Sequence, residues 1–459
     1  FNLMADLVIN HCSSRSRWFD NYKKGLAPGA GYFIEADPNI DLSHVTRPRT
    51  SPLLRPTDTV DGEKHVWCTF SHDQVDLNFA NPEVLHEIMK IIRFYLDRGA
   101  IIFRLDAVAF LWKDITTNCI NLPQTHEVIR LIRTLVEHCH SEAIIITETN
   151  IPNRENISYF GNANEAHMVY NFSLPPLLLY TLVSGDCTAL KSWAMSMPPA
   201  QDGTAYLNFI ASHDGIGLRP AEGLLPDEKI KDLADLVEHN GGKISWRSVD
   251  ASTMKPYELN IALWDAFKCN LSKEEDGYQF ARFIAAHTIM LAVEGVPALY
   301  IHSLFATTND YQRAENTGHN RAINRHQWQL DNLQAVLEDT DSHHAAVFAK
   351  LKQLLTIRKG QPAFHPNATQ FTLHLGTEVF GFWRQCANRQ QSIFCINNIS
   401  DKPQTLALTD INLIELDSWW DLLSDSAFDT SQPTFTLAPY QAVWLSNQNY
   451  QQIAPSGDN

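Results

Sequence analysis

The sequence is poor in positive charge. Lysine and arginine together number 36, against 52 aspartate and glutamate residues, and the formal net charge is -16 at pH 7. A protein that binds nucleic acid neutralises phosphates with a basic surface, which this composition does not supply. We therefore expect no nucleic-acid partner.

Membrane-length apolar runs and paired cysteines are missing as well. No apolar stretch reaches the roughly 20 residues that span a membrane, and no basic-then-apolar leader opens the chain. The eight cysteines are scattered without a CxxC pair, which favours reduced thiols over a disulfide framework or a zinc site. These absences predict a cytoplasmic protein with no membrane partner, no metal and no other cofactor.

What the sequence does contain is an alternation of short apolar segments with amphipathic ones, which is typical of parallel βα units. The predicted strands cover residues 3–9, 100–106, 143–148, 167–172, 205–211 and 297–302, and the predicted helices cover residues 83–96, 125–138, 278–292 and 344–358. This order predicts an α/β protein built on a barrel. Because Phe1 stands directly before a strand-like segment, we also expect an N-terminal truncation.

Two segments interrupt the alternation. Residues 12–80 show little periodicity, and residues 215–256 carry mixed charge and glycine; insertions of this length at strand ends roof the active site of a barrel. Past residue 365 the pattern changes to short alternating strands. We therefore predict a catalytic barrel over residues 1–365, an inserted domain B over 12–80, a loop insertion over 215–256 and an antiparallel β domain over 366–459.

Four strand-like segments end in polar side chains: "DLVINH" (6–11), "FRLDAVAF" (103–110), "IIITETN" (144–150) and "NFIASHDGIG" (208–217). The strands of a parallel barrel end at one mouth, so Asp106, Glu148 and Asp214 are predicted to converge there. Three carboxylates suit a retaining glycosidic mechanism. Taken alone, Arg104 and Asp106 would equally well form a structural ion pair.

Local environment suggests the roles. Arg104 favours the ionised form of Asp106, which suits a nucleophile. Glu148 follows an apolar run, and partial burial suits a general acid. His11 and His213, with Asp214, offer hydrogen-bond donors and acceptors to sugar hydroxyls, although a single histidine after a strand is more often structural.

The ordered set "DLVINH", "QVDLN", "FRLDA", "TETN" and "ASHD" resembles the strand-end motifs of the α-amylase superfamily, glycoside hydrolase family thirteen. The resemblance implies a (β/α)8 TIM barrel with an inserted domain B, whose first two strands would be missing from this sequence. It also implies that Asp106 is the nucleophile, Glu148 the acid/base and Asp214 the transition-state stabiliser. The sugar-contacting residues that it implies are Arg104, His11 and His213.

Further segments are similar to the sucrose phosphorylase group, namely "SHDGIGLRP", "GLLPDE", "FSLPPLLLYTL" and "NRAINRH". This similarity implies phosphate as the glucosyl acceptor. It also implies that Arg325 binds substrate and that Arg49, in "RPR", handles phosphate or the acceptor, where a guanidinium fork can receive phosphate oxygens. A solvated loop arginine is the alternative for Arg49.

The stretches "TETNIPNRENISYFG", "KHVWCTFS" and "PYELN" look more like the glucosylglycerate phosphorylase branch. In the last of them, Glu258 stands where the sucrose enzymes have glutamine, which implies a different leaving group. Tyr257 in the same stretch, with Phe70 and Gln74 in the inserted segment, completes the substrate-binding candidates. Phe70 could instead belong to the core.

The expected function is that of a retaining α-glucoside phosphorylase. It would convert an α-glucoside such as glucosylglycerate, with phosphate, to α-glucose 1-phosphate and the free aglycone by double displacement. Phosphorolysis of sucrose or sucrose 6′-phosphate, and α-glucosidase or transglucosylase activity, remain open. A non-catalytic amylase-like binding protein is the remote alternative.

Overall fold

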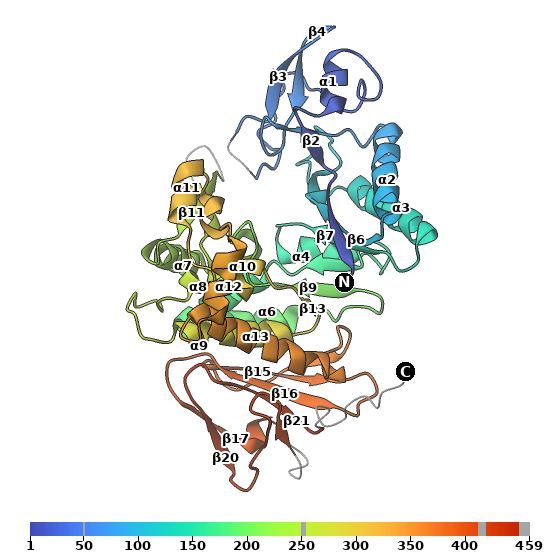
Figure 1. Ribbon diagram of the computed structural model, residues 1–459. Helices are drawn as coiled ribbons and strands as arrows, with labels where there is room; N and C mark the ends of the chain where they lie inside the picture. The colour runs from blue at the N-terminus through green and yellow to red at the C-terminus, as the bar shows by residue number, and fades with distance from the viewer. Residues whose placement is uncertain (49–50, 249–253, 412–418, 449–459) are drawn as a thin grey trace. The chain divides into compact units, whose positions relative to one another are not determined.

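The computed structural model describes residues 1–48, 51–248, 254–411 and 419–448 and divides into two compact units (Figure 1). Unit 1 comprises Phe1–Tyr170 and Arg247–Lys255. Unit 2 comprises Asn171–Trp246 and Pro256–Asn459.

A parallel sheet forms the centre of unit 1. Its strands, in spatial order, are β1 (Leu3–Val8), β6 (Ala100–Asp106), β7 (Ile144–Glu148) and β8 (Met168–Tyr170). The successive residues Phe103, Arg104 and Leu105 are all buried, as expected of parallel strands covered on both faces. The predicted strands are confirmed to within two residues at each end. The register pairs Asp106 with Glu148, so the two predicted catalytic carboxylates stand side by side at their strand ends.

Two long helices flank this sheet, α2 (Pro82–Leu96) and α3 (Pro123–Cys139), both of which were predicted (Figure 1). Asn81 caps α2 by accepting a hydrogen bond from the backbone of Glu83, and Pro82 occupies the first turn, where its missing N–H costs nothing. The apolar face of α2 is buried in the same core as β6. Amphipathic spacing therefore located these helices correctly. The short helix α4 (Asn153–Ile157) follows β7.

The inserted segment after β1 is folded rather than irregular. β2 (His11–Ser13) pairs antiparallel with β5 (Gln74–Asp76), and β3 (Leu54–Thr59) forms a hairpin with β4 (Gly62–Trp67). Helix α1 (Arg17–Lys23) packs beside this hairpin (Figure 1). β2 begins the inserted segment and β5 lies near its end. Because these two strands pair, both ends of the insertion lie close to the end of β1.

Unit 2 contains the parallel pair β9 (Ala205–Asn208) and β13 (Val296–Pro297). The strand predicted over residues 297–302 is wrong beyond Pro297, because Ile301–Leu304 forms helix α10. A short apolar run does not distinguish a strand from a buried helical turn. β10 (Ile216–Gly217) pairs antiparallel with β12 (Met254–Asn260).

Most of unit 2 before its C-terminal antiparallel sheet is helical. The helices of this part include α5 (Leu174–Ser184), α6 (Thr188–Ser196), α7 (Asp227–His239), α8 (Leu263–Ala266), α9 (Gln279–Ala292), α11 (Tyr311–Thr317), α12 (Leu330–Glu338) and α13 (His343–Lys359), with strand β11 (Lys243–Ser248) after α7. Helices α9 and α13 were predicted and agree to within one residue at each end. Both contribute to a large apolar core, with α5 buried over almost its whole length.

An antiparallel sheet ends unit 2, as predicted. Its strands, in spatial order, are β14 (Thr369–Thr372), β15 (Val379–Gln385), β16 (Ser392–Asn398), β21 (Ala442–Ser446), β18 (Trp420–Asp421) and β19 (Ser426–Ala427), and a separate pair joins β17 (Gln404–Ala407) to β20 (Thr434–Leu437). The buried Arg384 of β15 donates to the carbonyl of Ala292 at 2.7 Å and so joins this sheet to α9. The described strands begin shortly after residue 365.

Candidate active site

Arg104 lies between three carboxylates of unit 1. Its Nη1 donates to Asp106 Oδ2 and to Asp6 Oδ1, each at 2.7 Å, and its Nη2 lies 3.8 Å from Glu148 Oε1. Burial lowers the pKa of Arg104, but Glu148 and Asp106 outweigh that effect, and the pKa ends above its ordinary value. The guanidinium therefore stays charged and holds the carboxyl group of the predicted nucleophile by a charge-assisted hydrogen bond.

The backbone after β6 also faces Glu148. Ala107 adopts a left-handed conformation with φ 60°, which turns the chain sharply at the strand end. Its N–H points to Glu148 Oε2 at 3.5 Å. The backbones of the paired Asp106 and Glu148 are neighbours in the sheet, where adjacent strands lie about 4.8 Å apart.

Three predicted substrate-binding residues meet at β2 and the loop before β5. Gln74 Nε2 lies 2.8 Å from His11 Nε2, and the Phe70 ring lies 5.1 Å from the His11 ring. Phe110 meets Phe70 edge-on at 5.4 Å. The aromatic pair and the histidine thus form one partly buried wall with a polar edge, which is the kind of surface that an apolar sugar face contacts.

His11 is poised to act as a neutral hydrogen-bonding group. Burial lowers its pKa below the ordinary 6.5, and the carboxylates of Asp76 and Asp106 offset part of that effect. Its second ring nitrogen, Nδ1, lies 3.2 Å from Asn10 Nδ2. A neutral imidazole held at both nitrogens keeps a fixed orientation towards a ligand.

Lys113 was missed by the sequence analysis. Its side chain is 3% exposed; its Nζ lies 2.6 Å from Asp76 Oδ2, donates to Asn10 Oδ1 at 2.8 Å and also donates to the carbonyl of Phe110. Burial lowers its pKa, and Asp76 offsets part of the effect. No sequence motif marks Lys113, because its partners lie far away in the chain. It supports the loop that holds His11.

Asp214 of unit 2 is held by two arginines. Arg321 Nη1 donates to Asp214 Oδ1 at 2.5 Å, and Arg325 Nη2 donates to the same oxygen at 3.1 Å. Arg325 Nε also donates to the carbonyl of His213 at 2.6 Å, and His213 Nε2 lies 3.4 Å from Asp214 Oδ1. Three predicted site residues, Asp214, His213 and Arg325, therefore lie together.

Arg321 is a second residue that sequence reasoning missed. A usable signal was its place in "NRAINRH", the same short motif that contains Arg325. Its other donors contact Glu258 of β12, at 3.0 Å from Nε to Oε1 and 2.6 Å from Nη2 to Oε2. Tyr257 precedes Glu258 in β12 and is buried.

Arg49 lies outside the described residues. Arg55, another arginine of the insertion, donates from Nη1 to the carbonyl of His72 at 2.6 Å. Among the described residues, no group of three or more His, Cys, Asp or Glu side chains is arranged to hold a metal ion. All eight cysteine thiols are free. No helix in the described part of the chain is both long and apolar enough to cross a membrane.

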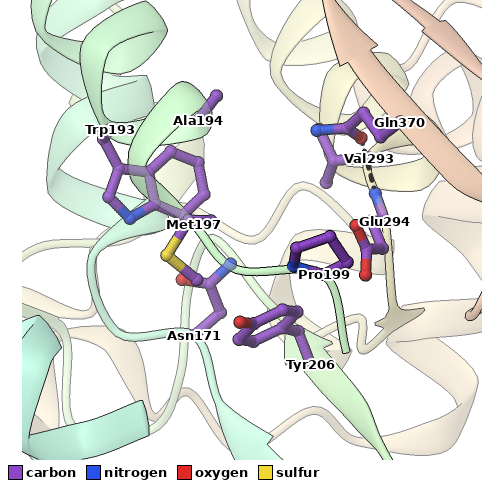
Figure 2. A pocket seen from close by; sticks show the side chains of 9 residues that line it. All are labelled: Asn171, Trp193, Ala194, Met197, Pro199, Tyr206, Val293, Glu294 and Gln370. Carbon is purple, nitrogen blue, oxygen red and sulfur yellow. Dashed lines mark hydrogen bonds between the residues drawn. The ribbon is translucent and has the colours of Figure 1, made fainter. Parts of the chain in front are cut away.

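Unit 2 also contains a small pocket, shown in Figure 2, that is separate from the predicted site residues. Its lining includes Trp193, Tyr206 and Glu294; Glu294 Oε1 accepts from the backbone of Ala200, and the Glu294 N–H donates to Gln370. Its volume is about 50 Å³, well below the roughly 300–1,000 Å³ of sites for drug-sized ligands. The pocket therefore does not hold a disaccharide-sized substrate.

The chain is similar in sequence to known proteins of one family. The family model of the α-amylase catalytic domain matches residues 1–215. A glucosylglycerate phosphorylase from Allomeiothermus silvanus is 42% identical over 446 residues, which cover 97% of this chain and 77% of that protein. One from Escherichia coli is 40% identical over 447 residues, covering 97% and 78%.

Among solved structures, sucrose 6F-phosphate phosphorylase from Thermoanaerobacter thermosaccharolyticum superposes with a TM-score of 0.73 at 22% identity, covering 87% of this chain and 79% of that one. That similarity shows the fold. The chain belongs to the α-amylase family and is an enzyme with its (β/α)8 TIM barrel, inserted domain B and C-terminal antiparallel β domain. The relatives named above are sugar phosphorylases of that family, as the motifs predicted.

Proposed function

We propose that the protein is a retaining α-glucoside phosphorylase whose donor is glucosylglycerate. The observation that carries this proposal is the identity of 42% and 40%, over 97% of the chain, to two proteins with that named activity. With phosphate, the reaction would yield α-glucose 1-phosphate and glycerate.

In the first step, Asp106 attacks the anomeric carbon while Glu148 donates a proton to the glycosidic oxygen. The bond to glycerate breaks, and a covalent β-glucosyl ester forms on Asp106. Arg104 supports this step because its hydrogen bond to Asp106 at 2.7 Å keeps the nucleophile oriented. Nη2 of the same guanidinium lies 3.8 Å from Glu148 Oε1, so Arg104 lies beside both carboxyls that take part in this step.

In the second step, phosphate attacks the same carbon from the face that the aglycone left, and Asp106 departs as a carboxylate. Two inversions retain the α configuration. An anionic phosphate oxygen needs little deprotonation, so Glu148 acts mainly in the first step. Asp214 stabilises the positive charge that develops on the ring in both transition states.

The remaining predicted residues would bind substrate. His11 and His213 offer hydrogen bonds to ring hydroxyls, and Arg325 contributes a partly exposed guanidinium beside Asp214. Further contacts to the donor, the aglycone or phosphate are assigned to Phe70, Gln74, Tyr257 and Arg49. We place the enzyme in the cytoplasm, which the eight free thiols support, since such thiols persist in a reducing compartment.

The test is release of glucose 1-phosphate by the purified full-length protein. Glucosylglycerate, sucrose and sucrose 6′-phosphate are each supplied with and without phosphate, and glucose 1-phosphate and glucose are quantified separately. Phosphate-dependent glucose 1-phosphate from glucosylglycerate alone supports the proposal. The same product from a sucrose donor changes the leaving group; free glucose independent of phosphate indicates a hydrolase. No product from any donor, or from α-glucosyl fluoride, favours a binding protein.

A further inference from the structure

Glu258 faces a partly exposed arginine, Arg321, rather than an open site. The residue is 1% exposed. Its Oε1 accepts from Arg321 Nε at 3.0 Å and from Asn260 Nδ2 at 2.6 Å, and its Oε2 accepts from Arg321 Nη2 at 2.6 Å. Since both carboxylate oxygens are occupied inside the protein, this side chain is poorly placed to contact a leaving group.

The same arginine reaches the predicted stabilising carboxylate. With Nε and Nη2 of Arg321 held by Glu258, its Nη1 donates to Asp214 Oδ1 at 2.5 Å. A planar guanidinium fixed at two donors has little freedom at the third. The position of Asp214 is therefore tied to Glu258 through one rigid group.

The contacts to Asp214 are one-sided. Arg321, Arg325 and His213 all approach Oδ1, at 2.5, 3.1 and 3.4 Å. Among the described residues, no hydrogen bond or ion pair is found at Oδ2, and the side chain is 29% exposed. Oδ2 is thus the oxygen available to a substrate hydroxyl or to the developing charge of the ring.

A second tie runs through the backbone. Asn260 Nδ2 donates to Glu258 Oε1 at 2.6 Å and to the Asp214 carbonyl at 3.1 Å, and Ser245 Oγ donates to Asn260 Oδ1 at 2.7 Å. β12 also pairs with β10 beside this point, with Gly217 opposite Glu258. Glu258 is therefore linked to the side chain of Asp214 through Arg321 and to its main chain through Asn260.

We propose that Glu258 and Arg321 are positioning residues that hold Asp214 so that its Oδ2 faces the reacting sugar. This inference rests on the proposed role of Asp214 in glucosyl transfer. Glutamine at position 258 would not serve equally well. Its amide has one acceptor oxygen and a donor NH2 group, so it satisfies half of the Arg321 fork and directs an N–H at the other donor.

The test uses Glu258→Gln and Arg321→Lys. Each variant keeps roughly the same volume and removes the two-pronged contact. A displacement of about 1 Å at a reacting group costs on the order of 100-fold in rate, so we expect kcat to fall roughly 10- to 100-fold while the KM for the donor changes less than about twofold. The double variant should be no slower than Arg321→Lys, because both substitutions break one interaction.

A matched control separates positioning from stability. Arg282, which is fully buried, forms a similar fork with Asp276 in unit 2, at 2.6 and 2.9 Å, away from the Asp214 turn. Asp276→Asn should lower the thermal midpoint and leave kcat unchanged. The proposal is overturned if Glu258→Gln keeps kcat within twofold of wild type. It is also overturned if the activity of Glu258→Gln falls only in proportion to the fraction of folded protein, which is the behaviour expected of Asp276→Asn. Should Glu258→Gln not fold, Arg321→Lys decides by the same criteria.

The choice of substrate keeps the two proposals apart. α-Glucosyl fluoride reports glucosyl transfer to any acceptor, whether phosphate or water. A wild-type protein that consumes the fluoride but makes no glucose 1-phosphate from glucosylglycerate refutes the proposed donor and still allows the variants to be measured. A wild-type protein that consumes neither refutes glucosyl transfer, and the role assigned to Glu258 and Arg321 falls with it.

Discussion

Arg104 Nη1 lies 2.7 Å from Asp106 Oδ2, with the arginine side chain almost fully buried and the aspartate partly open to solvent. Here the cation is enclosed and the anion is offered outwards, which suits a nucleophile that must stay ionised and reach a substrate.

Replacing Asp106 by Asn should abolish turnover. The amide cannot form the glucosyl ester, and the loss of a catalytic nucleophile costs roughly 10⁴-fold or more in kcat. The rate is measured with α-glucosyl fluoride, and folding by circular dichroism, because Arg104 loses one partner while keeping Asp6. A folded Asp106→Asn protein with a near-normal rate would remove this residue from the nucleophile role.

Replacing Glu148 by Gln should separate substrates by leaving group. Fluoride departs without a proton, whereas an alkoxide needs one, so the variant should lose several hundred-fold on natural glucosides and far less on α-glucosyl fluoride; general acid catalysis contributes roughly 10²–10⁴-fold. The ratio of kcat/KM for the two substrates is the measurement. An equal loss on both would argue that Glu148 binds substrate or maintains structure instead.

Replacing Lys113 by Met should destabilise unit 1 strongly. Asp76 is fully buried and would lose its cation, and breaking a buried ion pair costs about 3–5 kcal/mol. Guanidinium unfolding measures the change. Lys90→Met is the control, since Lys90 forms an exposed pair with Glu87 that should contribute under about 1 kcal/mol. Equal effects of the two substitutions would contradict the role given to Lys113.

His287 should make unit 2 less stable in mild acid. The residue is fully buried, and burial lowers its pKa from 6.5 to about 4. Between those values the unfolded chain binds a proton that the folded protein does not, so stability is full above pH 6.5 and falls as the pH falls. From pH 6.5 to 5, at 1.36 kcal/mol per pH unit, the loss from this group is about 2 kcal/mol.

The measurement for His287 is the unfolding free energy at pH 7 and pH 5, in wild type and in His287→Gln. Because other histidines also titrate, the quantity compared is the change in unfolding free energy between pH 7 and pH 5. This change should be smaller in His287→Gln than in wild type. His86→Gln, at an exposed position with a weak contact to Glu83, should leave the difference unchanged. If His287→Gln kept the wild-type pH dependence, His287 would not have a lowered pKa in the folded protein.

The limits of the sequence-based predictions are visible at particular elements. β6 is a short apolar run and α13 has buried residues at helical spacing, and both were predicted almost to the residue. The run after Gly295 reads as one strand, yet it ends at Pro297 and becomes α10. The insertion reads as irregular, although β3 and β4 pair there, because a hairpin with polar residues on both faces has no clear alternation.

The sequence by itself determined that carboxylates and histidines stand at the ends of apolar strands, because apolar runs and the polar residues that end them are local properties. Only the tertiary structure decided the partners of those groups. Arg321 meets Asp214 across 107 positions, and Lys113 meets Asn10 across 103. Such pairs form only when distant elements pack together, and no local sequence pattern predicts which charged side chains will pair.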